Sequence, residues 1–126
     1  MKKKVLVVED DVRIGQKILV ETKNIECVTG VKLATSIKEA IKSLDDEFYE
    51  IIVLDLNLPD GNGIQLLRWL KEKQIQTKVL VFSINKELKR LCLQNGAYSF
   101  YDKSKDFDSL LIDIKDCETD FQWSNA

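Results

Sequence analysis

Histidine is missing from this 126-residue sequence, and its absence excludes several kinds of chemistry. Catalytic Ser-His-Asp and Cys-His arrangements, histidine-ligated zinc and a phosphohistidine carrier all require that side chain. Whatever chemistry the chain carries must therefore use carboxylates, hydroxyl groups, lysines, backbone groups or a bound cation.

Cysteine and proline are also scarce. The three cysteines, Cys27, Cys92 and Cys117, are odd in number, widely spaced and set among apolar residues. We therefore expect buried free thiols rather than a disulfide or a metal site. With one proline, five glycines and no internal repeat, the sequence offers no linker. We predict one domain over residues 1–118, followed by a short C-terminal tail over residues 119–126.

Long apolar runs and an excess of one charge are absent as well. No stretch approaches the length of a membrane span, and the lysines at residues 2–4 are not followed by a signal-peptide core. We expect a cytoplasmic protein without membrane contact, and interpret these lysines as a solubilising lead-in to a strand. The 19 basic and 21 acidic residues are interleaved, which indicates no face for direct nucleic-acid binding.

What the sequence contains is a regular alternation of short apolar runs and amphipathic segments. The apolar runs are rich in valine and isoleucine, which is typical of strands buried on both faces. We predict strands over five segments: residues 4–8, 27–33, 51–56, 78–82 and 98–101.

Between these runs, apolar residues recur at helical spacing. One stripe follows Ser36, which forms a capping box with Glu39, and another stops at Gly96, a residue type common just past a helix. The stripes are Ile14 with Ile18; Ile37, Ala40, Ile41 and Leu44; Ile64, Leu67 and Leu70; Leu88, Leu91 and Cys92; and Phe107, Leu110, Leu111 and Ile114. Five strand–helix units in succession predict an α/β fold, a parallel sheet with helices on both faces.

Polar side chains stand where the predicted strands end. In chain order they are Glu9, Asp10, Asp11, Asp55, Asn57, Ser83 and Lys103. The carboxyl ends of parallel strands lie at one edge of a sheet, where α/β proteins bind ligands. Taken singly, the acidic run fits helix capping, and serine or lysine is common in turns. Asp55 is different, because a charge inside an apolar strand needs a partner.

We expect the first and third strands to be neighbours, which brings Glu9, Asp10 and Asp55 together. Crowded carboxylates repel one another unless a cation neutralises them. Oxygen ligands without sulfur or imidazole favour Mg²⁺, which uses one or two carboxylates and keeps several waters. Lys103 and the Ser83 hydroxyl can then donate to a phosphoryl group. Such a set suits phosphoryl transfer, for which a carboxylate is an accepted nucleophile.

Five short motifs stand in a fixed order along the chain: VVEDD at residues 7–11, DLNLPDGNG at 55–63, FS at 82–83, NGA at 95–97 and DK at 102–103. Their order and separation resemble those of the receiver domains of bacterial response regulators. The resemblance runs from about Lys4 to about Cys117. It implies a flavodoxin-like, doubly wound, five-stranded parallel sheet of order 2-1-3-4-5 with five helices.

The resemblance also implies how the site works. Asp55 is the phosphoacceptor and takes a phosphoryl group from a sensor histidine kinase or a phosphotransfer protein. Asp10, Asp55 and the backbone carbonyl of Asn57 bind Mg²⁺ directly, while Glu9 acts through water. Lys103 contacts the phosphoryl group. At most, the domain dephosphorylates itself slowly, and it is not a turnover enzyme.

A switch follows from the same resemblance. Ser83 moves to hydrogen-bond the phosphoryl group, and the aromatic switch residue Phe100 turns inward after it. This changes the surface formed by the fourth helix, fifth strand and fifth helix. A downstream effector protein or output domain reads that surface, and a phosphorylation-linked dimer is a further expectation.

Three residues depart from the usual receiver pattern. Ser104 replaces a common proline, which resembles stand-alone receivers and those joined to LuxR-type or FixJ-type output domains, and leaves the isomer of the preceding peptide bond open. Phe100 lacks the hydroxyl of the tyrosine that is often found there. Ile84 stands where a small residue is commoner, and its bulk can narrow access to Asp55.

Other functions compete with this interpretation. A phosphatase of the haloacid-dehalogenase type needs a second aspartate where Asn57 stands. A flavodoxin-like cofactor binder needs a first loop that cradles phosphate, whereas residues 9–11 repel it. A pseudo-receiver, never phosphorylated and acting as a protein-interaction module, stays open because of Ile84 and Ser104.

Overall fold

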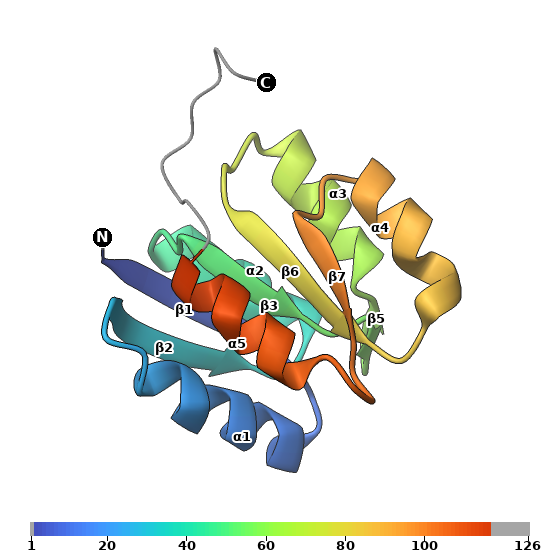
Figure 1. The fold of residues 1–126 in the computed structure, drawn as a ribbon. Helices are drawn as coiled ribbons and strands as arrows, with labels where there is room; N and C mark the ends of the chain where they lie inside the picture. The colour runs from blue at the N-terminus through green and yellow to red at the C-terminus, as the bar shows by residue number, and fades with distance from the viewer. Residues whose placement is uncertain (1, 117–126) are drawn as a thin grey trace.

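A computed structural model of the chain describes residues 2–116, within which one five-stranded parallel sheet runs through the molecule (Figure 1). Its strands are β1 (Lys3–Val8), β2 (Val28–Ala34), β3 (Ile51–Leu54), β6 (Lys78–Ser83) and β7 (Ser99–Asp102). They lie in the order β2-β1-β3-β6-β7. Numbered within the sheet, this is 2-1-3-4-5, so the predicted topology is confirmed. Cys117 and the predicted boundary at residue 118 lie outside the described residues.

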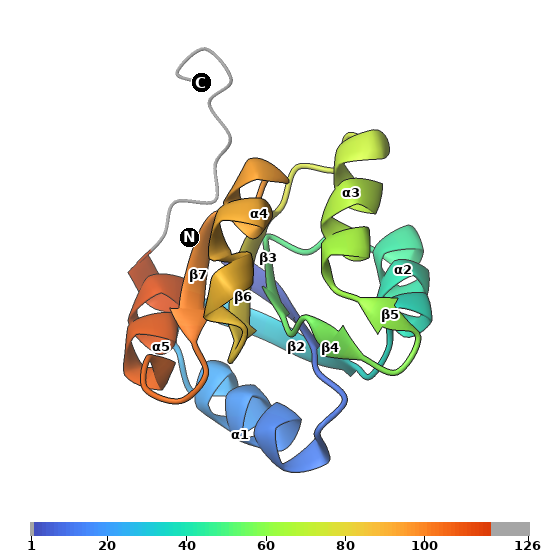
Figure 2. The same ribbon diagram turned by 90° about the vertical axis from the view of Figure 1, so that its right-hand side faces the viewer.

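Helices cover both faces of the sheet (Figure 2). The described part of the chain forms α1 (Val12–Lys23), α2 (Ile37–Asp46), α3 (Ile64–Glu72), α4 (Lys89–Gln94) and α5 (Phe107–Asp116). α1 and α5 pack on one face, and α2, α3 and α4 on the other. All five predicted helices are present, although the fourth starts later than its apolar stripe because Lys86–Leu88 forms a 3-10 turn.

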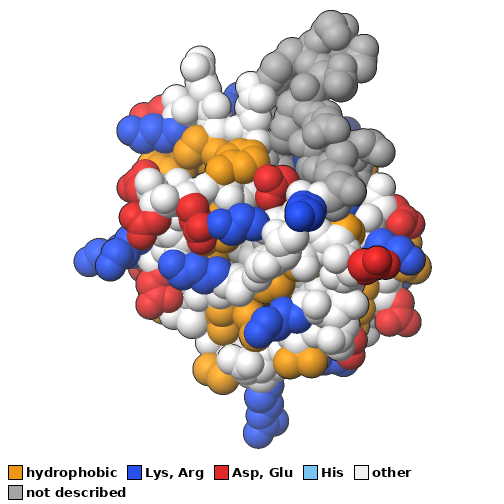
Figure 3. Space-filling view, turned by 90° about the vertical axis from the view of Figure 1, so that its left-hand side faces the viewer, with side chains coloured by type: hydrophobic (Ala, Val, Ile, Leu, Met, Phe, Trp, Pro, Cys, Tyr) orange, Lys and Arg blue, Asp and Glu red, His pale blue; other side chains and the backbone are white. Residues whose placement is uncertain are grey.

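Two buried clusters explain the near-continuous apolar runs of the sequence. Along β1, Leu6 and Val8 belong to the cluster under α2, α3 and α4, whereas Val5 and Val7 belong to the cluster under α1 and α5. A strand covered on both faces must be apolar at every position. On the face shown in Figure 3, basic and acidic side chains are interspersed. Within residues 2–116, no helix is both long and apolar enough to cross a membrane.

A small antiparallel hairpin was not expected from the sequence. β4 (Asn57–Leu58) pairs with β5 (Gly61–Asn62), directly after β3. The sheet strand therefore stops at Leu54, two residues before the predicted end at residue 56. Asp55 and Leu56 thus lie between the sheet strand and the hairpin.

The prediction for the cysteines is wrong in one case. Cys92 is a buried free thiol, as expected, and burial raises its pKa. Cys27 is also free but only half-buried, because it lies just before β2, an edge strand of the sheet.

The interpretation of the first lysines is wrong for Lys3. Its side chain is buried, and its ammonium group donates hydrogen bonds to the carbonyl oxygens of Ile114 and Lys115, each at 2.8 Å. The last carbonyls of a helix have no partners within it, and they carry partial negative charge. Lys3 thus caps the C-terminus of α5 from the start of β1.

We expect Lys3→Met to lower the free energy of unfolding by about 1–3 kcal/mol, because the variant keeps the apolar stem but loses both hydrogen bonds to the helix carbonyls. Urea denaturation measures the change. Lys2→Met is the matched control, since Lys2 is exposed, and it should change stability by less than about 0.5 kcal/mol. Equal effects in the two variants would show that the cap contributes nothing.

Candidate functional site

The register of the central strands brings two acidic residues together. Val8 of β1 pairs with Leu54 of β3, and the next residues are Glu9 and Asp55. The amide of Asp55 donates to the carbonyl of Val8 at 2.9 Å, so the ladder continues to the edge of the sheet. Because both strands end at this edge, the two carboxyl side chains emerge next to each other.

Three carboxylates gather at this edge. Glu9, Asp10 and Asp55 each place an oxygen within 4.8 Å of the others. The side chains of Glu9 and Asp55 are only 2% and 5% exposed, whereas Asp10 is exposed. Asp11 does not join them, because its carboxylate caps α1 and accepts from the amides at residues 13 and 14. The predicted cluster is therefore present, with Asp11 as a helix cap.

Lys103 reaches the acidic cluster from the end of β7. Its ammonium nitrogen lies 2.6 Å from Glu9 Oε1 and 3.3 Å from Asp55 Oδ2. Burial by itself lowers the pKa of Lys103, but the hydrogen bond to Glu9 and the negative charges of Asp55 and Glu9 outweigh it, so the pKa lies above its ordinary value. The ammonium group is therefore a fixed positive charge at this edge.

One lysine does not balance the acidic cluster. Burial raises the pKa of Glu9 to about 7, the hydrogen bond from Lys103 opposes that rise, and the neighbouring Asp55 adds to it. Because Asp55 places a carboxylate oxygen within 4.8 Å of one from Glu9, ionisation of Glu9 costs free energy unless more positive charge is supplied. The site thus has a deficit of positive charge and offers oxygen ligands to a cation.

The raised pKa of Glu9 predicts a pH dependence for the metal-free protein. The unfolded chain releases the Glu9 proton near pH 4.5, whereas the folded protein holds it to about pH 7. Between these values the native state binds more protons, so stability falls as pH rises. Glu9→Gln should remove this fall and add on the order of 2–3 kcal/mol at pH 7. Urea denaturation in the presence of a chelator, repeated between pH 4.5 and about 7, measures the free energy of unfolding. If it falls with pH as steeply in the variant as in the unmodified protein, the prediction is wrong.

Ser83 stands at the end of β6, the strand next to the one that leads to Asp55, and is fully buried. Its hydroxyl oxygen accepts the amide N–H of Asn85 at 3.0 Å and donates to Asn85 Oδ1 at 3.3 Å. The same Oδ1 accepts from the side-chain amide of Asn57 at 2.9 Å. Asn57 in turn donates its backbone N–H to Asp55 Oδ1 at 3.3 Å. Sequence reasoning missed Asn85, because an asparagine in a turn is too common to attract notice.

The hairpin after Asp55 is held by two contacts. The Asp60 carboxylate accepts from the first amides of α2, those of Ile37 and Lys38, both at 2.9 Å. Gly63 lies so close to Asp55 that an added Cβ would be 2.5 Å from the Asp55 carbonyl oxygen. The motif at residues 55–63 therefore positions the backbone around Asp55.

The three departures from the receiver pattern have distinct surroundings. Phe100 is half-buried against the cluster under α4, and Ile84 is 61% exposed at the rim. No cis peptide bond occurs among the described residues, so the Lys103–Ser104 bond is trans. The Ser104 amide and hydroxyl both donate to Asp102 Oδ1, at 2.9 Å and 2.7 Å. Serine thus uses an N–H that proline would lack.

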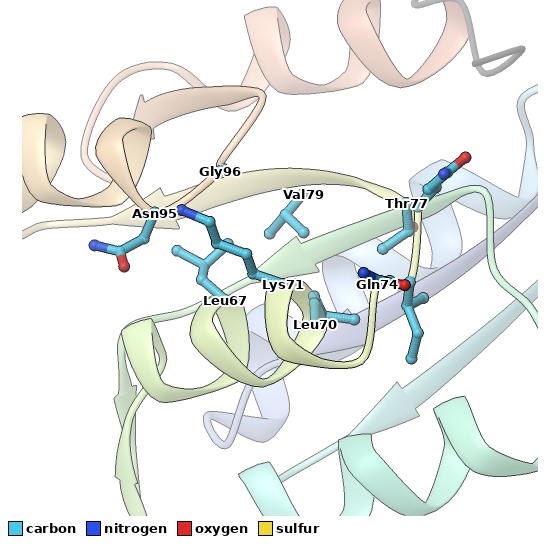
Figure 4. A pocket seen from close by; sticks show the side chains of 10 residues that line it. Leu67, Leu70, Lys71, Gln74, Thr77, Val79, Asn95 and Gly96 are labelled. Atoms are coloured by element: carbon cyan, nitrogen blue, oxygen red, sulfur yellow. The ribbon is translucent and has the colours of Figure 1, made fainter. Parts of the chain in front are cut away.

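A pocket of about 600 Å³ lies away from this edge (Figure 4). It opens between the end of α3 and the turn after α4, at the start of β6. Its lining includes Leu67, Leu70, Thr77, Val79 and Gly96. Ser83 stands at the opposite end of β6, so this pocket is separate from the acidic cluster.

Comparison with known proteins agrees with this geometry. The response regulator receiver domain family matches residues 5–115. The receiver domain of the Francisella response regulator 1452 is 30% identical with a TM-score of 0.82, covering 90% of this chain and 93% of that one. The BeF3-activated DrrB receiver domain of Thermotoga maritima is 26% identical with a TM-score of 0.75, covering 91% and 96%.

The family match, together with the sheet topology, identifies a receiver domain of two-component response regulators. The chain belongs to the response regulator receiver domain family. Some relatives have other activities. The protein-glutamate methylesterase/protein-glutamine glutaminase of Treponema denticola is 34% identical over 107 residues, which cover 79% of this chain and 28% of that protein. The chain spans 44%, 28% and 37% of the length of three curated relatives.

Proposed function

We propose that this receiver is a phosphoacceptor, which takes a phosphoryl group onto Asp55 from a sensor histidine kinase or a phosphotransfer protein. One observation carries the proposal. The buried carboxylate of Asp55 lies within 4.8 Å of oxygens from Glu9 and Asp10 and 3.3 Å from the Lys103 ammonium group. No packing role accounts for three carboxylates and one lysine at the ligand-binding edge of the sheet.

The donor set fits Mg²⁺. It consists of hard oxygen atoms, without sulfur or imidazole. The negative charge of its carboxylates exceeds the positive charge of the single lysine. Asp10, Asp55 and the backbone carbonyl of Asn57 would bind the ion directly, with Glu9 acting through water. When bound, Mg²⁺ neutralises negative charge on a transferring phosphoryl group.

The chain's own residues then have defined tasks. A carboxylate oxygen of Asp55 forms the new bond to phosphorus as the bond to the donor's nitrogen breaks. The Lys103 ammonium group, already 3.3 Å from Asp55 Oδ2, stabilises the negative charge of the phosphoryl oxygens. The Ser83 hydroxyl supplies a second donor once it turns toward the group.

The switch acts through the neighbouring surface. When Ser83 moves, Phe100 turns inward, and the surface formed by α4, β7 and α5 changes. This surface exposes apolar side chains, among them Leu91, Leu93 and Ile112, at 36%, 42% and 56%. An effector protein, an output domain or a second phosphorylated copy would bind there. A receiver domain over residues 1–118 is part of the same proposal.

Intact mass spectrometry tests the proposal. Treatment with acetyl phosphate and Mg²⁺ should add one phosphoryl group, and omission of Mg²⁺ should reduce the labelled fraction at least about tenfold, because the metal neutralises developing charge. A protein that stays unlabelled under conditions that label a control receiver would be a pseudo-receiver, acting only as a protein-interaction module.

A further inference from the structure

The side chain of Asn85 joins two loops at the mouth of the site. Its Oδ1 accepts hydrogen bonds from Asn57 Nδ2 at 2.9 Å and from the Ser83 hydroxyl at 3.3 Å. Asn57 follows β3 and Asn85 follows β6, and these two strands are neighbours in the sheet. One oxygen atom therefore links the loop after Asp55 to the loop after Ser83.

The Ser83 hydroxyl has only one hydrogen to donate. In this structure that hydrogen is directed at Asn85 Oδ1, while the hydroxyl oxygen accepts the Asn85 amide at 3.0 Å. A phosphoryl oxygen on Asp55 needs the same hydrogen. Since Ser83 is fully buried, no bulk water can replace the lost partner, and the two acceptors compete directly.

The geometry of Asn85 also resists rearrangement. Its own amide group donates to Glu87 Oε1 at 3.0 Å, so both ends of the side chain are held. Release of Ser83 therefore requires Asn85 to lose the bond from the serine hydroxyl while its side chain is still held by Asn57 and Glu87.

We infer that Asn85 is a positioning residue that holds Ser83 away from Asp55 and thereby favours the unphosphorylated state. This inference rests on the proposed function, because it concerns the response of Ser83 to a phosphoryl group. Asn85 touches neither that group nor the metal in this role. It acts by occupying the Ser83 hydrogen until the phosphoryl oxygen displaces it.

Binding of beryllofluoride in excess Mg²⁺ tests the inference, followed by nuclear magnetic resonance of the folded protein. Asn85→Ala should be half-saturated at about threefold to tenfold lower beryllofluoride, because one competing hydrogen bond is removed. Its affinity for Mg²⁺ alone should stay within about twofold, since Asn85 bonds to the side chain of Asn57, whereas the proposed metal ligand is the backbone carbonyl of that residue. General damage to the fold would weaken the binding of both beryllofluoride and Mg²⁺. Tighter binding of beryllofluoride alone therefore indicates that Asn85 acts by positioning Ser83.

Two further variants set the controls. Glu87→Ala removes the third partner of Asn85 but leaves its bond to Ser83, and should change beryllofluoride binding by less than about twofold. In a Ser83→Ala background, Asn85→Ala should no longer improve binding. Weaker or unchanged binding by Asn85→Ala alone, or a full gain without Ser83, overturns the inference. Failure of the unmodified protein to bind beryllofluoride would instead overturn the proposed function, and the inference with it.

Discussion

Asp55→Asn should abolish phosphoryl labelling by acetyl phosphate and Mg²⁺, to the background of the measurement. The carboxylate oxygen is the nucleophile, and an amide of the same shape cannot take its place. Asparagine keeps the size of the side chain, so the fold and the neighbouring Lys103 should be retained. Intact mass measures the labelled fraction, and circular dichroism confirms that the variant is folded.

Asp102→Asn is the matched control for that experiment. Asp102 is also buried at the carboxyl end of a sheet strand, but its carboxylate is engaged by the amide and hydroxyl of Ser104 and lies 3.5 Å from Lys86. It takes no part in the acidic cluster. The control variant should be labelled as the unmodified protein is. If labelling survives in Asp55→Asn and disappears in Asp102→Asn, Asp55 is not the phosphoacceptor.

Gly63→Ala should lower the free energy of unfolding by about 1–3 kcal/mol, because the added methyl group overpacks a closed contact. The new Cβ would lie 2.5 Å from the Asp55 carbonyl oxygen and 3.1 Å from Leu56 Cα. Both are backbone atoms, so no side-chain rotation relieves the contact. The backbone at Asp55 must shift, and phosphoryl labelling should fall together with stability.

The sign of this result is informative. Gly63 has φ −56 and ψ −21, values that alanine adopts readily, so strain in the backbone of residue 63 is not the cause. Without the contact, alanine for glycine stabilises by about 0.4–1 kcal/mol through the unfolded state. Gly30→Ala is the control, because nothing lies within 4 Å of its added Cβ. Urea denaturation measures the free energy of unfolding of both variants. Equal changes in the two variants would contradict a steric role for Gly63.

Much of the fold was predictable because its signals are local. Valine-rich runs such as residues 78–82 indicate strands buried on both faces, and stripes such as Ile37 to Leu44 indicate helices. Regular alternation then leaves few topologies, since parallel crossovers are right-handed. For the same reason the edge that carries Asp55 could be named, because strand ends follow from strand directions.

The sequence by itself therefore determined the sheet, its helices and the group of residues at its carboxyl edge. Only the tertiary structure decided which groups pair. Lys103 lies 2.6 Å from Glu9, Lys3 caps α5, and Asn85 joins Ser83 to Asn57. Each pairing depends on how chain segments far apart in sequence approach one another. Lysine and asparagine side chains are mostly exposed to solvent in proteins, so their presence in a sequence does not indicate a protein partner. Periodicity reports which face of an element is buried, but it carries no information on the partner of a polar side chain.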